Sequence, residues 1–335
     1  MAQHPSIATY LDTFATTHTP ATVRAARRDL TQFAAWWEQR RDRAFDPALL
    51  RDTDLAAWRI ARQRDDGAAP ATINRAIAAL RAYGAWLAAT DLTTENPAAS
   101  LAILPLPPAA PKALPAGAVD ALLRAARAEK DERLRLRDEA ILALLVYAGL
   151  RVQEVCDVQL RDLDLRAATV TVRYGKKANH RRLPLSPDAL TLLKRYLDGV
   201  RCSAGTPALG SDAEREPLLV GFDRAISGGV QLGVNQRLVQ RVVRARAVEA
   251  AERLERDAVK EANLERAGRM LEYAAALRQA TPHTLRHSLA RRMLDTGADI
   301  AAVQRALGHR SLRTTSIYTV PSDDDLREQM RRAGV

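Results

Sequence analysis

The sequence has very few cysteines and no long apolar run, and each shortage narrows what the chain can be. Its two cysteines, Cys156 and Cys202, could form one disulfide, but they are too few for a structural zinc site. In an intracellular protein they are better interpreted as small buried or bystander side chains. No apolar run is long enough to cross a bilayer, and the start lacks a basic stretch followed by an apolar one. We therefore expect a cytoplasmic protein without membrane association.

The charge balance, by contrast, is strongly one-sided. The 335 residues include 51 basic and 40 acidic side chains, which gives a formal net charge of +11 and an isoelectric point near 10.1. Residues 1–100 contain twelve Arg, no Lys and eleven acids, so the other +10 lies in residues 101–335. Such an excess favours a polyanionic partner, usually nucleic acid, although a basic protein that binds no polyanion is the alternative.

Length and apolar spacing predict two domains. The chain is long for one ordinary core, and its 47% of hydrophobic residues is enough to bury two. Residues 6–90 have apolar positions at three- and four-residue steps and no β-alternation, which predicts an all-helical domain. Six prolines from Pro97 to Pro115 block helix formation and favour a semi-rigid connector. We place the helical domain at residues 1–100, the linker at 101–112 and the second domain at 113–335.

Several helix starts are visible in the sequence. Thr19-Pro20 and Thr281-Pro282 each combine a capping side chain with proline at the first helical position, and Asp52 or Asp54 can cap another helix. In the second domain, two β-like runs at 169–174 and 181–185 flank a basic turn and predict a hairpin. The expected fold is mainly α with a small antiparallel β-sheet. Further helices are expected around residues 117–129, 134–148, 236–278, 284–296 and 299–307.

Two pieces of the second domain, one around Arg151 and one around His283, contain residue types that suit a phosphate group. Arg151 follows a helix that ends at Gly149, so its guanidinium can project into a cleft, and Glu154 could brace it with a fork-to-fork ion pair. His283 and Arg286 are three residues apart on one helical face near an N-terminus, where N–H groups and the dipole favour an anion. Taken singly, each pair is more often an ordinary surface feature.

Two further pieces complete the set. Lys176 and Lys177 form the one lysine pair in a chain that prefers Arg by 45 to 6, and they lie in the predicted turn. Arginine cannot serve as a proton donor, whereas the pKa of a lysine can be lowered at a phosphate site. A solvated turn is the alternative interpretation. The last piece runs from Leu307-Gly-His309 to Tyr318, and a tyrosine taken alone is more often a core aromatic.

Together, the four pieces resemble the tyrosine recombinase family, which includes phage integrases and Xer-type recombinases. The order Arg, Lys, His-x-x-Arg, His, Tyr matches, as do the strings G-L-R-x-x-E, H-x-L-R-H and L-G-H-x-S-x-x-T-T-x-x-Y. The resemblance covers nearly the whole chain. It implies a two-domain clamp, with a helical core-binding (SAM-like) domain that ends at Asn96-Pro97 and a mixed α/β catalytic domain of the integrase type.

The family's functional positions carry over residue by residue. The resemblance implies a catalytic set of Arg151, Lys176, His283, Arg286 and His309, with Tyr318 as the nucleophile. It implies supporting roles for Glu154, Asp162, Lys177 and His287. Asp162 falls where the family usually has an acid, and Lys177 is a near alternative for the lysine role.

The resemblance also implies the reaction. The tyrosine would cleave DNA through a 3′-phosphotyrosine, leave a free 5′-hydroxyl, and exchange strands through a Holliday junction. The covalent link stores the bond energy, so we expect no ATP, metal or other cofactor. The absence of a G-x-x-x-x-G-K-S/T loop and of an acidic metal cluster agrees with this expectation.

The expected partner is double-stranded DNA at a specific site, clamped between the two domains, with the protein associated with the nucleoid. Four strand cuts imply a homotetramer, or a heterotetramer with a related recombinase. One departure from the family is a charge-laced stretch at about 246–278, with seven basic and seven acidic residues, which we interpret as an insertion. A nicking–closing enzyme of the type IB topoisomerase or telomere resolvase kind, or a catalytically silent DNA-binding relative, are the alternatives.

Overall fold

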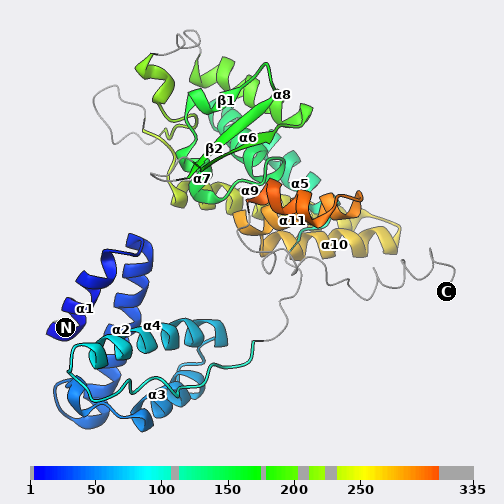
Figure 1. The fold of residues 1–335 in the computed structure, drawn as a ribbon. Helices are drawn as coiled ribbons and strands as arrows, with labels where there is room; N and C mark the ends of the chain where they lie inside the picture. Colours follow the sequence, from blue (N-terminus) through cyan, green and yellow to red (C-terminus); the bar gives the residue numbers. More distant parts are fainter. Residues whose placement is uncertain (1–3, 107–112, 175–178, 203–210, 223–231, 309–335) are drawn as a thin grey trace. The chain divides into compact units, whose positions relative to one another are not determined.

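The chain folds as two compact units, Met1–Ala109 and Ala110–Val335. The computed structural model describes residues 4–106, 113–174, 179–202, 211–222 and 232–308 (Figure 1). The predicted fold class is confirmed, because the structure is mainly helical with one three-stranded antiparallel sheet. Among these residues, no helix is both long and apolar enough to span a bilayer.

The first unit is a helical domain built around large aromatic side chains. Trp37, Trp58 and Tyr83 are each no more than 1% exposed and pack in one apolar cluster. Thr19 caps its helix as predicted, with its hydroxyl accepting the Thr22 N–H at 3.3 Å. Its elements are α1 (Pro5–Ala15), α2 (Pro20–Arg41), the 3-10 turn η1 (Pro47–Leu49), α3 (Asp52–Arg64) and α4 (Pro70–Ala89).

The start of α3 differs from the expectation. Arg51 occupies the N-cap position, so Asp52 and Asp54 lie inside the helix instead of before it. Asp54 still contributes to the cap, because its carboxylate accepts the Arg51 N–H at 3.3 Å. The same carboxylate accepts the Trp37 indole N–H at 3.2 Å, which explains why this aspartate is buried.

The chain that leaves α4 stays attached to the first unit as far as Leu104. Asn74 holds Leu104 at both main-chain groups: its amide donates to the Leu104 carbonyl and its oxygen accepts the Leu104 N–H, each at 2.8 Å. Arg81 donates to the Leu101 carbonyl at 2.7 Å. The connector between the units is therefore shorter than its run of prolines suggests.

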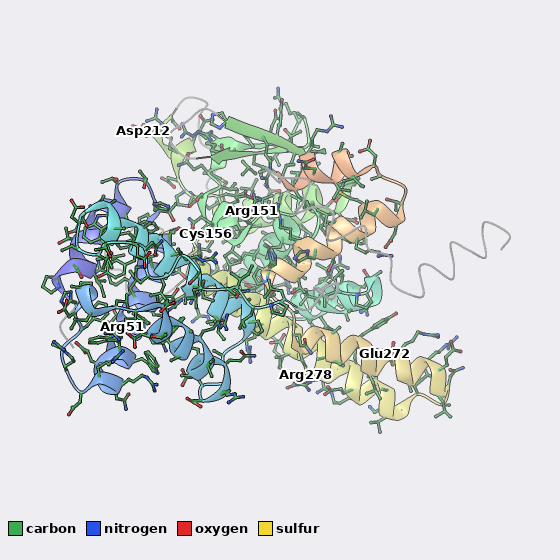
Figure 2. The ribbon with its side chains drawn as sticks, turned by 60° about the horizontal axis from the view of Figure 1, so that its bottom comes forward. Arg51, Arg151, Cys156, Asp212, Glu272 and Arg278 are labelled. Atoms are coloured by element: carbon green, nitrogen blue, oxygen red, sulfur yellow. The ribbon has the colours of Figure 1, made fainter. Side chains whose placement is uncertain are left out.

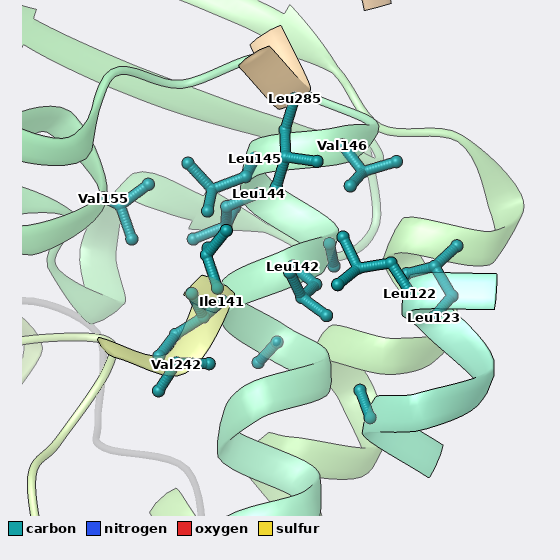
Figure 3. Close-up of a cluster of buried hydrophobic side chains, with 14 of the residues drawn as sticks. Leu122, Leu123, Ile141, Leu142, Leu144, Leu145, Val146, Val155, Val242 and Leu285 are labelled. Atoms are coloured by element: carbon teal, nitrogen blue, oxygen red, sulfur yellow. The ribbon is translucent and has the colours of Figure 1, made fainter. Parts of the chain in front are cut away.

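The second unit surrounds the buried helix α6. Ile141, Leu142 and Leu145 are fully buried, and apolar side chains of α5, α7, α9 and α11 contact this helix (Figure 3). The second half of α6, residues 140–146, is apolar on all sides and therefore belongs in a core, where each leucine contributes about 1.5–3 kcal/mol. The helices are α5 (Ala116–Arg127), α6 (Glu132–Val146), α7 (Val152–Asp157), α8 (Pro187–Tyr196), α9 (Gln236–Lys260), α10 (Leu264–Arg278), α11 (Pro282–Asp295) and α12 (Ile300–Leu307). Short helical turns are η2 (Leu160–Asp162), the π-type η3 (Leu197–Arg201) and η4 (Asp212–Arg215).

The sheet has the strand order β1–β2–β3, all antiparallel. Its strands are β1 (Leu163–Asp164), β2 (Thr169–Tyr174) and β3 (Asn179–Pro184). Val170 pairs with Leu183 and Val172 pairs with Arg181, so these four side chains share the face that meets the core. Residues 175–178, which connect β2 with β3, lie outside the described residues.

The stretch predicted to be helical at 236–278 consists of two helices. α9 ends at Lys260 and α10 begins at Leu264 after Asn263, whose side chain caps it by accepting the Arg266 N–H at 3.0 Å. The two helices are joined by a fork in which Arg278 donates to both carboxylate oxygens of Glu255, at 2.9 and 2.6 Å; Figure 2 labels Arg278 and Glu272 along this pair. Val239, Val243 and Ala247 of α9 are buried in the main core.

Candidate active site

Arg151 begins the site at the point where α7 starts. It occupies the N-cap position, and Glu154 in the first turn accepts its backbone N–H on Oε2 at 2.8 Å. The guanidinium Nη1 donates to Oε1 of the same carboxylate at 2.8 Å. Arg151, labelled in Figure 2, has a side chain that is 41% exposed, whereas that of Glu154 is 8% exposed. The buried acid therefore braces an arginine that reaches solvent.

A second arginine, Arg181 of β3, forms a two-pronged ion pair with Glu154. Its Nη1 lies 3.2 Å from Oε1 and its Nη2 lies 2.7 Å from Oε2. The Arg181 side chain is 12% exposed, and burial lowers its pKa while the Glu154 charge opposes that change. The bidentate geometry is the strong form of an arginine–carboxylate contact.

Arg286 of α11 is the third arginine near Glu154, with Nη1 4.0 Å from Oε2. Its side chain is 3% exposed, and it donates hydrogen bonds to the main-chain carbonyls of Gly149 and Leu307. Gly149 has a φ of +63°, and a Cβ there would lie 2.7 Å from Leu289 Cδ2, so glycine is required at this turn. The three guanidinium groups and one carboxylate give the cluster a net charge of +2.

Two of these arginines also contact the C-terminal end of α12. Arg286 donates to the Leu307 carbonyl, and Arg151 Nη2 donates to the Gly308 carbonyl at 3.1 Å. Gly308 ends the helix in the left-handed conformation, with a φ of 60°. Three pieces that are far apart in sequence, at 149–154, 283–287 and 307–308, therefore meet at one point.

The histidines of α11 lie beside Arg286 in the same helical turns. The His283 and His287 rings pack edge to face, with centroids 4.3 Å apart. His283 is exposed and His287 is half-buried, so His283 is the more accessible of the two. The predicted helix start is confirmed: Thr281 caps α11, its hydroxyl accepts the Thr284 N–H at 3.1 Å, and Pro282 is the first helical residue.

Asp162 contacts the face of the β2–β3 hairpin opposite to that of Arg181. It is 2% exposed, accepts the Gln159 N–H at 2.9 Å and forms an ion pair with Arg173 of β2. Arg173 pairs with His180 across the hairpin, whereas Arg181 is one position further along β3, so the two arginines point to opposite faces. Both strands are thus tied to buried acids.

Four predicted site residues fall outside the described part of the chain. They are Lys176, Lys177, His309 and Tyr318. Within the described ranges, no group of three or more His, Cys, Asp or Glu side chains is arranged to hold a metal ion. Cys156 and Cys202 are both free thiols, and burial raises the pKa of Cys156 to about 11.

Arg181 is not among the site residues predicted from the motifs. Its signal was nevertheless present, because Arg181, Leu183 and Leu185 alternate along one strand and therefore share the core-facing side. An arginine on such a face needs a buried acid, and Glu154 is that acid.

Comparison with known proteins decides the family. Residues 112–324 match the phage integrase family, and residues 7–91 match the N-terminal SAM-like domain of phage integrases. The chain belongs to the phage integrase family. This tyrosine recombinase is an enzyme that breaks and rejoins DNA.

Individual relatives agree over most of the chain. It is 30% identical to the tyrosine recombinase XerD of Ralstonia nicotianae, over 91% of this chain and 85% of that protein. It is 31% identical to the tyrosine recombinase XerC of Xanthomonas campestris pv. campestris, over 89% and 78%. Its fold is similar to that of the Tn1549 transposon integrase in complex with transposon right end DNA, with a TM-score of 0.65, 16% identity and coverage of 98% and 99%.

Proposed function

We propose that this recombinase cleaves its DNA site by attack of the Tyr318 phenol oxygen on a backbone phosphorus. The new bond joins tyrosine to the 3′ side of the break, and the bond from phosphorus to the 5′ oxygen is lost. Lys176 protonates the departing 5′ oxygen, and His283 assists proton movement. Ligation reverses these steps, so the bond energy is kept in the covalent link.

The observation that supports this proposal is the meeting of Arg151 and Arg286 beside one buried carboxylate. A phosphate gains negative charge on its non-bridging oxygens during attack, and fixed cationic donors at those oxygens are usually the largest contribution to catalysis. We assign that role to the two arginines. His309 follows the Gly308 carbonyl that Arg151 binds, and we assign it a third hydrogen bond to the phosphate.

We infer that the working form is a tetramer on two double-stranded sites, either of one chain or with a related recombinase, and that exchange passes through a Holliday junction. The XerH recombinase bound to its difH substrate and a lambda integrase dimer bound to a core site are similar in fold, which supports DNA as the partner. Phosphate contacts by the basic chain predict binding that weakens as salt rises. We infer that the protein acts in the cytoplasm, on nucleoid DNA.

Trapping on a suicide substrate tests the nucleophile. Sequencing the DNA that remains covalently bound to the wild-type protein first identifies the site. On that site, the wild type should form an adduct that resists denaturant, whereas Tyr318→Phe should bind the DNA with similar affinity and form no adduct. A denaturant-resistant adduct with the phenylalanine variant would show that another residue attacks.

A further inference from the structure

The carboxylate of Glu154 is fully occupied by donors from two arginines. An ionised carboxylate offers about four lone-pair sites. Oε1 receives Arg151 Nη1 and Arg181 Nη1, and Oε2 receives the Arg151 backbone N–H and Arg181 Nη2, all between 2.7 and 3.2 Å. Arg181 therefore fills half of the capacity of this acid.

This occupancy limits how strongly Glu154 attracts the other two arginines. Arg151 commits Nη1 to the carboxylate while its Nη2 reaches Gly308, and Arg286 Nη1 stays at 4.0 Å. Without Arg181, two lone-pair sites of Glu154, which is 7% exposed, would have no hydrogen-bond donor. An unpaired buried acceptor is costly, so the nearest cations would turn towards it.

Arg181 is well placed for such a role and poorly placed for direct contact with DNA. Its side chain is 12% exposed, on the core-facing side of β3, and its backbone pairs with Val172 of β2. The sheet thus holds the Arg181 guanidinium in place, whereas the Arg151 side chain, which is 41% exposed, reaches solvent. The two-pronged contact with Glu154 is therefore the route by which we expect Arg181 to affect the reaction.

We propose that Arg181 is a positioning residue: by satisfying half of Glu154, it keeps Arg151 and Arg286 directed at the scissile phosphate. This inference rests on the proposed function, which assigns those two arginines to the phosphate. A displacement of a catalytic group by about 1 Å can lower the rate about 100-fold.

The test compares two substrates in single-turnover cleavage by the full chain. One substrate has the ordinary scissile phosphate of the mapped site, and the other has a methylphosphonate there, which lacks one anionic oxygen. Arg181→Met should cleave the phosphate about 100-fold more slowly than the wild type, with DNA binding changed less than about twofold. On the methylphosphonate the difference should shrink to about threefold or less, because less charge needs stabilisation.

The neighbouring residue supplies the control. Arg182 lies on the same strand, its side chain is 58% exposed, and it pairs with the exposed Asp164. Arg182→Gln should differ from the wild type by less than about twofold on both substrates, as expected for a surface pair. An equal defect of Arg181→Met on the two substrates would overturn the positioning role, since a general loss of structure slows both.

Two more variants keep the outcomes distinguishable. Arg151→Ala should itself recover on the methylphosphonate; if it does not, the phosphate role in the proposed function fails, and the inference about Arg181 fails with it. If Arg151→Ala recovers and Arg181→Met does not, the proposed function stands and the positioning role is refuted. If Arg181→Met does not fold, Arg181→Lys is tested instead, because lysine keeps the positive charge but lacks the two-pronged guanidinium contact with Glu154. A folded Arg181→Lys that cleaves the ordinary phosphate at the wild-type rate would also refute the role.

Discussion

Arg246 of α9 connects three acids from three parts of the second unit, and its replacement gives a prediction with a definite size. Its Nε donates to Asp138 at 3.0 Å, its Nη1 donates to Glu249 at 2.7 Å, and its Nη2 pairs with Glu129. The Arg246 side chain is 9% exposed and that of Asp138 is 1% exposed. The variant Arg246→Met keeps the apolar stem and removes the charge and all its donors.

The cost of Arg246→Met follows from what each acid retains. Removing one partner of a buried ion pair costs about 3–5 kcal/mol. Asp138 still has Arg137 at 2.8 Å, and the side chains of Glu129 and Glu249 are 19% and 47% exposed, so water can reach them. We therefore expect the lower end of that range, about 3 kcal/mol. For a unit of about 200 residues this lowers Tm by about 6–12 °C.

Thermal unfolding followed by circular dichroism measures this change. The matched control is Arg253→Met, the same substitution two turns along α9, where Arg253 is exposed on the rim of a cavity of about 330 Å³ that Arg246 also lines. The control should change stability by less than about 0.5 kcal/mol. A drop in Tm of less than about 2 °C for Arg246→Met, or equal drops for both variants, would refute a stabilising role for the buried cluster.

Two further predictions concern the site and its surroundings. Gly149→Ala should lose about 1–2 kcal/mol of stability from the left-handed φ, and more because the added Cβ would lie 2.7 Å from Leu289 Cδ2. It should also cleave poorly because the Gly149 carbonyl orients Arg286. Gly67→Ala, with a φ of +58° and no atom within 4 Å of the added Cβ, should share the effect of φ alone. Equal cleavage by the two variants in the adduct assay would contradict this account. Burial raises the pKa of Cys156 to about 11, so about 0.1% of it is thiolate at pH 8 in the folded protein. It should therefore react slowly with iodoacetamide in the folded protein and fast in urea. Equal labelling rates in the two conditions would show that the thiol is not protected.

The elements predicted correctly from sequence are those whose signals are local. Thr19 and Thr281 cap their helices as expected, because a cap depends on residues three positions away. The division between α9 and α10 was missed, since residues 261–263 contain neither glycine nor proline and Asn263 is the sole local signal.

In the candidate site too, prediction from the sequence succeeded only where the signal is local. The motifs identified Arg151, Glu154 and Arg286, which the structure places together at one carboxylate. Arg181 was overlooked because its partner Glu154 lies 27 positions earlier in the chain, and that pairing depends on how β3 packs against α7. The alternation of Arg181 with Leu183 predicts a core-facing arginine, but the acid with which it pairs cannot be derived from spacing along the sequence.

The anchoring of the connector at both ends limits how far apart Leu104 and Leu114 can lie. Leu104 is fixed by Asn74, and the Leu114 N–H donates to the buried Ser288 hydroxyl at 2.8 Å. Ten residues of extended chain span at most about 33–36 Å, so these two points can never separate further. If both units bind the duplex, as the clamp expected from the sequence requires, so short a tether would keep a dissociated unit at an effective concentration of about millimolar. A unit that dissociates would then rebind far more often than the whole protein would leave, which would keep the enzyme on its site during the proposed strand exchange.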